Sequence, residues 1–145
     1  MELLKSFNSL VDNKNTNIRI AIEEILKFLC DKGICTQKDI LFEVKVIINE
    51  LIQNAINHGN KNNVDKVVKL KVKIADEYIC IIVEDQGEGY NFKQLMGIVE
   101  DNQLDVCDIC DLKESGRGIY LVKNLSERMA FNSKGNKVEV IKKVK

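Results

Sequence analysis

The stretch that decides the fold reads Glu50-Leu51-Ile52-Gln53-Asn54-Ala55-Ile56-Asn57-His58-Gly59-Asn60. Glu50, Asn54 and His58 stand four residues apart, so on a helix they share one polar face. Apolar residues occupy another face, and Gly59 is a typical helix stop. The stretch therefore predicts an amphipathic helix that ends near Gly59. Taken alone, its polar face is what any solvent-facing helix shows.

A second motif follows the apolar run Tyr78–Val83, which we expect to be a central strand, and it reads Asp85-Gln86-Gly87-Glu88-Gly89. Its glycines allow a tight turn and a close approach of the backbone to a ligand, although an isolated motif of this kind is equally compatible with a plain turn. A third motif, Ser115-Gly116-Arg117-Gly118, opens a predicted helix. The N–H groups and dipole at a helix start suit an anion such as phosphate, but a Gly-x-Gly pair by itself is weak evidence.

Periodicity predicts the remaining elements. Alternation of apolar residues and lysines across 68–74 is typical of a half-buried strand. Helical spacing predicts a helix over 15–33, and a capping-box pattern at Thr36 and Asp39 begins the helix that carries Glu50. The other expected segments are a weak strand at 2–8, a long loop over 86–115 with a short helix near 92–99, a helix at 118–128, and a hairpin of 130–133 with 137–144. This order predicts the α/β class, as a two-layer α/β sandwich.

Composition limits the classes of function. A chain of 145 residues and 16.5 kDa suits one domain. Its 22 basic and 22 acidic residues balance, so no net charge favours nucleic acid or an anionic membrane. The longest apolar run, 78–83, is far shorter than the about 20 residues of a membrane span, and no apolar signal segment follows Glu2. Five irregularly spaced cysteines disfavour a disulfide framework. We therefore expect a cytoplasmic protein with reduced thiols that contacts neither nucleic acid nor membrane directly.

The three motifs, in this order, resemble those of the GHKL ATPases, the superfamily of gyrase, heat-shock chaperones, histidine kinases and mismatch-repair proteins. The stretch 50–60 is similar to their asparagine box, and 85–89 and 116–118 are similar to their two glycine boxes. Within the superfamily, the details resemble the anti-sigma factor serine kinases. That closer resemblance rests on Glu50 four residues before Asn54, on the ending His58-Gly59-Asn60, and on the run Gly116-Arg117-Gly118-Ile119-Tyr120-Leu121-Val122. It implies the Bergerat ATP-binding fold, a mixed, mainly antiparallel sheet with helices on one face, in a single histidine-kinase-like ATP-binding domain over residues 1–145.

The resemblance also implies roles at the base end of an ATP site. Asn54 would offer its amide oxygen to Mg²⁺, an ion that takes few protein ligands and completes its shell with phosphates and water. Asp85 would accept the amino group of adenine, and Gly87 and Gly89 would let the backbone pass close to the base. Asn136 stands where the family commonly has a threonine that helps to hold adenine. Because Asn both donates and accepts hydrogen bonds, we expect adenine binding to survive this change.

At the phosphate end, the resemblance implies that Gly116, Arg117 and Gly118 lie beside the phosphates and that residues 90–115 form a lid. Glu50 would be the general base for an attacking serine hydroxyl or water. One departure concerns the first glycine box, where Glu88 replaces a common proline.

These roles predict an ATP-binding anti-sigma factor with serine/threonine protein kinase activity and with ATP and Mg²⁺ as cofactors. It would phosphorylate an anti-anti-sigma protein and sequester a sigma factor, and the family implies a homodimer. The alternative is a nucleotide-gated interaction module without useful phosphotransfer, although Glu50 favours the kinase. A lone histidine-kinase catalytic domain fits less well, because such domains usually continue as Gly-x-Gly-Leu-Gly, whereas residues 116–120 read Gly-Arg-Gly-Ile-Tyr.

Three features remain open. The expected lid is acidic, which fits either a solvated loop or a surface that contacts a partner. Cys107 and Cys110 form a C-x-x-C motif within it, but Cys30 and Cys35 have the wrong spacing for a common zinc ribbon, so we expect free thiols. His58 is the only histidine, and it is either a structural group at the helix end or a neighbour of phosphate.

Overall fold

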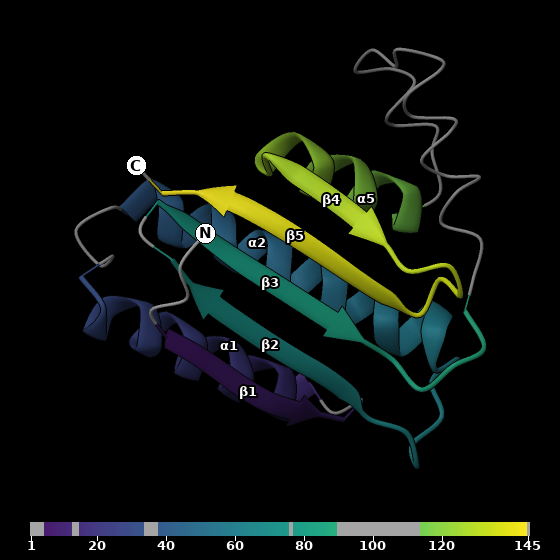
Figure 1. The fold of residues 1–145 in the computed structure, drawn as a ribbon. Helices are drawn as coiled ribbons and strands as arrows, with labels where there is room; N and C mark the ends of the chain where they lie inside the picture. Colours follow the sequence, from purple (N-terminus) through teal and green to yellow (C-terminus); the bar gives the residue numbers. More distant parts are fainter. Residues whose placement is uncertain (1–4, 13–14, 34–37, 76, 90–113, 145) are drawn as a thin grey trace.

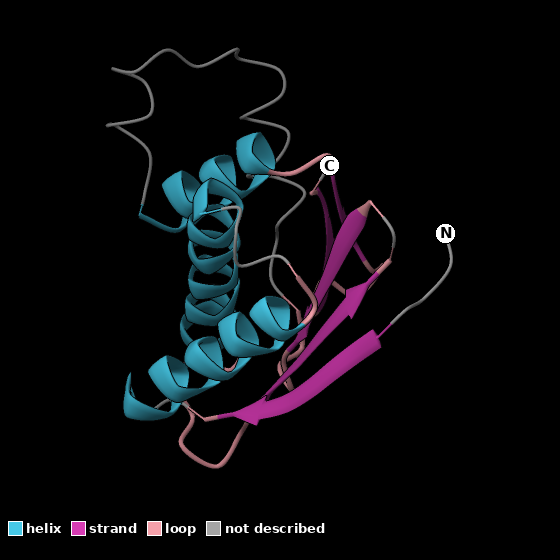
Figure 2. Ribbon diagram, turned by 90° about the vertical axis from the view of Figure 1, so that its left-hand side faces the viewer, coloured by secondary structure: helices cyan, strands magenta, loops and turns pink. Residues whose placement is uncertain are grey.

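Figure 1 shows the computed structural model, which describes residues 5–12, 15–33, 38–75, 77–89 and 114–144. In chain order the elements are β1 (Lys5–Val11), α1 (Asn15–Asp31), α2 (Lys38–Asn54), the π-helical turn η1 (Ala55–Gly59), β2 (Val68–Ile74), β3 (Tyr78–Glu84), α5 (Glu114–Leu125), β4 (Arg128–Phe131) and β5 (Lys137–Lys143). The strands form one five-stranded sheet in the order β1-β2-β3-β5-β4. The helices α1, α2 and α5 cover one face of the sheet (Figure 2). This arrangement confirms the predicted two-layer α/β sandwich.

The sheet is antiparallel at each strand pair that the structure describes. The sequence-based expectation of a mixed sheet is therefore wrong for these strands. Hairpins explain the β2–β3 and β4–β5 pairs, because neighbouring strands joined by short turns pair antiparallel. β5 inserts between β3 and β4, with Val83 opposite Val138, so the end of the chain lies beside the central strand that leads to Asp85.

The hydrophobic core lies between the sheet and the helices. In β2 the apolar positions Val68, Leu70, Val72 and Ile74 are buried, as the alternation with lysine predicts. Ile47, Ile48, Leu51 and Ile52 of α2 are also almost completely buried, so α2 is the central helix of the helical layer. Within the described ranges, no helix is both long and apolar enough to span a membrane.

Two boundaries differ from the sequence-based prediction. The strand expected at 2–8 lies at Lys5–Val11, where its seven residues pair with β2. The helix expected at 118–128 runs from Glu114 to Leu125, because Arg128 already pairs with Ile141 in the β4–β5 hairpin. Tertiary pairing thus decides both boundaries, which local periodicity locates poorly.

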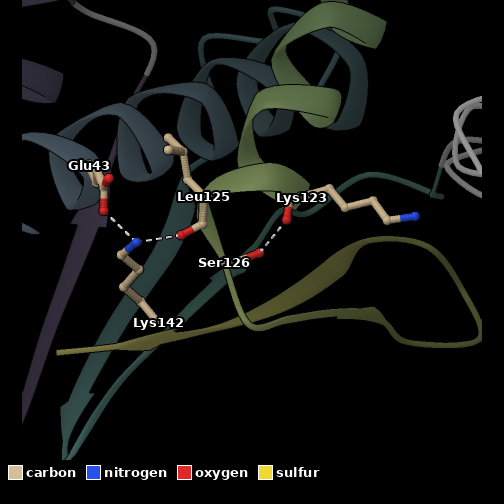
Figure 3. Close-up of polar contacts among 5 residues, drawn as sticks. All are labelled: Glu43, Lys123, Leu125, Ser126 and Lys142. Carbon is tan, nitrogen blue, oxygen red and sulfur yellow. Dashed lines mark hydrogen bonds and ion pairs between the residues drawn. The ribbon is translucent and has the colours of Figure 1, made fainter. Parts of the chain in front are cut away.

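A buried lysine joins three elements of the fold (Figure 3). Lys142 of β5 forms an ion pair with Glu43 of α2, and its side chain is only 10% exposed. Its Nζ also donates a hydrogen bond of 2.6 Å to the backbone oxygen of Leu125, the last residue of α5. Carbonyl groups at a helix C-terminus lack intrahelical donors and carry partial negative charge, so a cation there is stabilising. Lys142 therefore fixes the C-terminal end of α5 to α2 and the sheet.

Candidate functional site

Asp85 is packed tightly between the end of η1 and its own loop. Its side chain is buried, and its Oδ1 accepts a hydrogen bond of 2.8 Å from the N–H of Gly87. A Cβ atom on Gly59 would overlap the Asp85 carboxylate, and a Cβ on Gly87 would overlap the backbone oxygen of Gly59. Glycine is therefore required at both positions by close approach, which brings the first and second sequence motifs into direct contact.

The β4–β5 hairpin covers the other side of the Asp85 loop. The N–H of Asp85 donates to the backbone oxygen of Asn136 at 2.9 Å, and Nδ2 of Asn136 donates to the backbone oxygen of Asp85 at 3.3 Å. The Oδ1 of Asn136 accepts from Nδ2 of Asn132 at 2.7 Å. Gly89 has φ +92°, and a Cβ there would overlap the backbone oxygen of Lys134. The Asn136 amide thus holds the hairpin to the loop, while its contact with adenine stays a prediction.

Asn54, the last residue of α2, presents a buried amide. It is 5% exposed, and its Nδ2 has no hydrogen-bond partner among the described residues. A buried polar group in this state costs about 1–3 kcal/mol, unless a ligand or water satisfies it. Rotation of the amide by 180° exchanges its oxygen and nitrogen, so either atom can face a ligand. The structure thus leaves unused hydrogen-bonding capacity at the position predicted to hold Mg²⁺.

A small cavity of about 10 Å³ connects these groups. Its lining consists of Leu51, Asn54, Ala55, Val83, Asp85, Asn136, Lys137 and Val138. That volume accommodates about one water molecule, and a water needs two or more polar partners, which the lining supplies. The described residues therefore form the floor of a site, with an apolar wall and polar side chains from α2, the β3 loop and the last hairpin.

The ionisation of Asp85 is shifted by its surroundings. Burial raises the pKa of its carboxyl group above the ordinary value, because water stabilises the charged form better than the protein interior does. The negative charge of Glu84 acts in the same direction. The hydrogen bond from Gly87 and the positive charges of Lys134 and Lys66 offset only part of the rise. A buried carboxylate is a strong acceptor for a ligand N–H group.

Glu50 lies against the start of α5. The Glu50 side chain is half-buried, and a Cβ on Gly118 would overlap its carboxylate. The structure therefore brings together the predicted base and the third motif, which are 68 positions apart in the numbering. Gly116 and Arg117 belong to the first turn of α5, which begins earlier than predicted, and Gly118 is buried inside the helix.

Several sequence-based expectations lie wholly or mostly outside the described residues. They are the lid expected at 90–115, of which 90–113 are not described, the short helix expected near 92–99, the helix cap at Thr36, and the pair Cys107 and Cys110. In the described part of the chain, no group of three or more His, Cys, Asp or Glu side chains could hold a metal ion by itself. A cation at Asn54 would therefore depend on ligand atoms from a bound molecule and from water.

Burial divides the predicted polar face of Glu50, Asn54 and His58, since Asn54 is buried whereas His58 is exposed. α2 ends at Asn54 and continues as the π-helical turn η1, in which the N–H of Asn60 bonds to the backbone oxygen of Ala55 at 2.7 Å. Such turns are frequent at functional sites.

Sequence reasoning assigned no structural role to two asparagines, Asn60 and Asn132. Asn60 is buried, and its Oδ1 accepts from the N–H of Gln86 at 2.7 Å. Asn132 Oδ1 accepts from the N–H groups of Gly135, Asn136 and Lys137. For Asn132, the turn residues around Gly135 were a usable signal, because asparagine often bonds to backbone N–H groups in turns. No local pattern indicated the partner of Asn60.

The amino-acid sequence is similar to those of several known proteins. The profile of a histidine kinase-like ATPase domain matches residues 11–142. The serine-protein kinase RsbW of Staphylococcus epidermidis is 29% identical over 112 residues, which cover 74% of this chain and 68% of the relative. The anti-sigma F factor of Anoxybacillus flavithermus is 30% identical over 107 residues, which cover 72% of this chain and 70% of the relative. The anti-sigma F factor of Geobacillus stearothermophilus is 30% identical over 99 residues, with coverages of 68% and 64%.

Proposed function

Because this chain belongs to the histidine kinase-like ATPase domain family, we propose that it is an ATP-dependent serine/threonine protein kinase that phosphorylates an anti-anti-sigma protein and sequesters a sigma factor. The proposal treats residues 1–145 as a single ATP-binding domain. The observation that carries the ATP site is the pairing of a buried carboxylate, Asp85, with a buried amide that has an unsatisfied nitrogen, Asn54, on one cavity. The names of the relatives support the kinase and anti-sigma roles.

In the proposed site, each side chain has one task. Asp85 accepts the amino group of adenine, and Gly59 and Gly87 leave the space in which its carboxylate is held. The Asn54 amide oxygen is the protein ligand of Mg²⁺, which, when bound, neutralises charge on the phosphates. Gly116 and Arg117, in the first turn of α5, lie near the phosphates, where the helix start offers N–H groups without intrahelical partners.

Glu50 is proposed as the base that takes the proton from the attacking serine hydroxyl. Its support is the close approach to Gly118, which brings the carboxylate of α2 next to the helix predicted to bind phosphate. Phosphoryl transfer has a loose transition state in which positioning and charge stabilisation do most of the catalysis, so a base contributes toward the lower half of its usual 10²–10⁴-fold range.

The test combines partner capture with one substitution. The protein is used with Mg·ATP to retain proteins from its native cytoplasm, and phosphopeptides of the retained proteins are mapped. Glu50→Gln should keep ATP affinity within a few fold and lower phosphate transfer by about 10²–10³-fold, while the sigma factor is still bound. The matched control is Glu24→Gln, which removes an exposed carboxylate from α1 and should leave transfer unchanged.

Two results would contradict the proposal. If the unmodified protein transfers no phosphate to any retained protein, while ATP changes its affinity for a partner, the chain is a nucleotide-gated interaction module. If Glu50→Gln abolishes ATP binding, Glu50 belongs to the framework of the nucleotide site and is not the base. The family resemblance further supports a cytoplasmic homodimer, which light scattering on the purified protein tests as a mass of twice 16.5 kDa.

A further inference from the structure

Asn60 joins three segments that lie far apart in the sequence. It directly follows η1 and is only 3% exposed. Its Oδ1 accepts the N–H of Gln86 at 2.7 Å, and its Nδ2 donates to the backbone oxygen of Val67 at 3.1 Å. The N–H of Val67 in turn donates to Oε1 of Gln86 at 2.8 Å. The three bonds close a ring that ties the end of η1, the approach to β2 and the loop after β3 to one another.

Two members of this ring, Asn60 and Gln86, adjoin the backbone that contacts the Asp85 carboxylate. Gln86 lies between Asp85 and Gly87, whose N–H bonds to the Asp85 carboxylate at 2.8 Å. Gly59, the neighbour of Asn60 on the other side, lies in contact with that same carboxylate. Asn60 therefore holds both backbone segments between which the carboxylate is packed. Loss of its amide would leave the N–H of Gln86 without its acceptor and would let the two segments move apart.

We propose that Asn60 is a positioning residue that sets the selectivity of the nucleotide site for adenine, by fixing the two backbone segments that orient the Asp85 carboxylate. The proposal rests on the proposed function, in which Asp85 accepts the amino group of adenine. Asn60 acts only through Asp85, so it contributes to recognition of that amino group and not to binding of the phosphates. A bond that depends on direction weakens when its acceptor is held loosely.

The experiment compares two nucleotides that differ only at the recognised group. Affinities for Mg·ATP and for the Mg²⁺ complex of purine riboside triphosphate, which lacks the 6-amino group, are measured by titration calorimetry on the full chain. The unmodified protein should prefer ATP by about tenfold or more, the value of a hydrogen bond to a charged group. Asn60→Ala should lose most of that preference through weaker ATP binding, while its affinity for the analogue stays within about twofold.

Two further variants make the result specific. Gln86→Ala removes only the bond from Val67, at an exposed side chain, and should reduce the preference for ATP partially without affecting folding. The matched control is Asn63→Ala, since Asn63 is exposed and accepts a local hydrogen bond from the N–H of Asp65 at 2.9 Å. Its preference for ATP should equal that of the unmodified protein.

Each outcome decides a different claim. A loss of ATP preference in Asn60→Ala, with unchanged binding of the analogue, supports the positioning role. Equal weakening of both nucleotides, or no change in either, overturns it, because a merely structural residue does not distinguish the two ligands. If Asn60→Ala does not fold, an unchanged ATP preference in Gln86→Ala overturns the role. If the unmodified protein does not prefer ATP over the analogue, the assignment of Asp85 is wrong, and this inference is wrong with it.

Discussion

Replacement of Asp85 by asparagine should change stability and ligand binding in opposite directions. Asn keeps the shape of the side chain and an oxygen that can accept the 2.8 Å bond from Gly87. It removes the charge that the protein interior stabilises poorly. Since burial raises the pKa of Asp85, the folded chain binds its proton more tightly than the unfolded chain does. The free energy of unfolding therefore falls as pH rises from the ordinary aspartate value of about 3.9 through the raised folded value, and this loss is complete once the pH lies above the folded value.

In the absence of nucleotide, Asp85→Asn should consequently melt at a higher temperature than the unmodified protein at pH 7. The difference should disappear as the pH is lowered below about 3.9, where the aspartate is protonated in both states. Scanning calorimetry at several pH values measures this. The control, Asp65→Asn, makes the same charge change at an exposed position and should not stabilise the protein.

ATP should stabilise the Asp85→Asn variant less than it stabilises the unmodified protein. A lost hydrogen bond to a charged group, about 1.5–3 kcal/mol, weakens binding by about 10- to 150-fold. At an ATP concentration of about 100 times the dissociation constant of the unmodified protein, ATP stabilises that protein by about 2.7 kcal/mol and the variant by about 0.3–1.4 kcal/mol. For a chain of this size, the melting temperature should rise by roughly 8–11 °C and 1–6 °C, respectively. Equal ATP-induced shifts, or a lower melting temperature of the ligand-free variant at pH 7, would refute this account of Asp85.

Two further predictions concern α5. Gly118→Ala places a methyl group against the Glu50 carboxylate. Phosphate transfer should therefore fall by about 10²-fold, while ATP affinity stays within a few fold of that of the unmodified protein. The double variant Gly118→Ala with Glu50→Gln should transfer phosphate no more slowly than Glu50→Gln alone. Kinetic assays of all three variants would reveal an independent role of Gly118 as an additive loss. Lys142→Met should destabilise the protein by about 1.5–3 kcal/mol, less than for a fully buried pair because Glu43 is 31% exposed. Urea unfolding measures this value, and a loss no larger than that of the exposed control Lys143→Met would show that the contacts of Lys142 with Glu43 and Leu125 contribute nothing.

The sequence by itself determined the architecture and the position of the motifs along the chain. Helical spacing in α2 and alternation in β2 follow directly from which residues are buried, because a helix and a strand each bury every residue that points to the core. The order of motifs was sufficient to identify the ATPase superfamily, and the family match confirms that identification. Each helix, strand and motif is a local feature, so it can be recognised in a window of about 10–20 residues.

Only the tertiary structure decided how the motifs meet. It shows that Gly59 and Gly87 leave space for Asp85, that Gly118 leaves space for Glu50, and that Asn54 is buried whereas His58 is exposed. The bonds at Asn60 and Asn136 join residues 26 and 51 positions apart. Such contacts depend on the packing of whole elements against one another, which local periodicity does not encode. A glycine or asparagine is therefore recognisable in the sequence as a turn former, while its partner is known only after the helical layer and the sheet have come together.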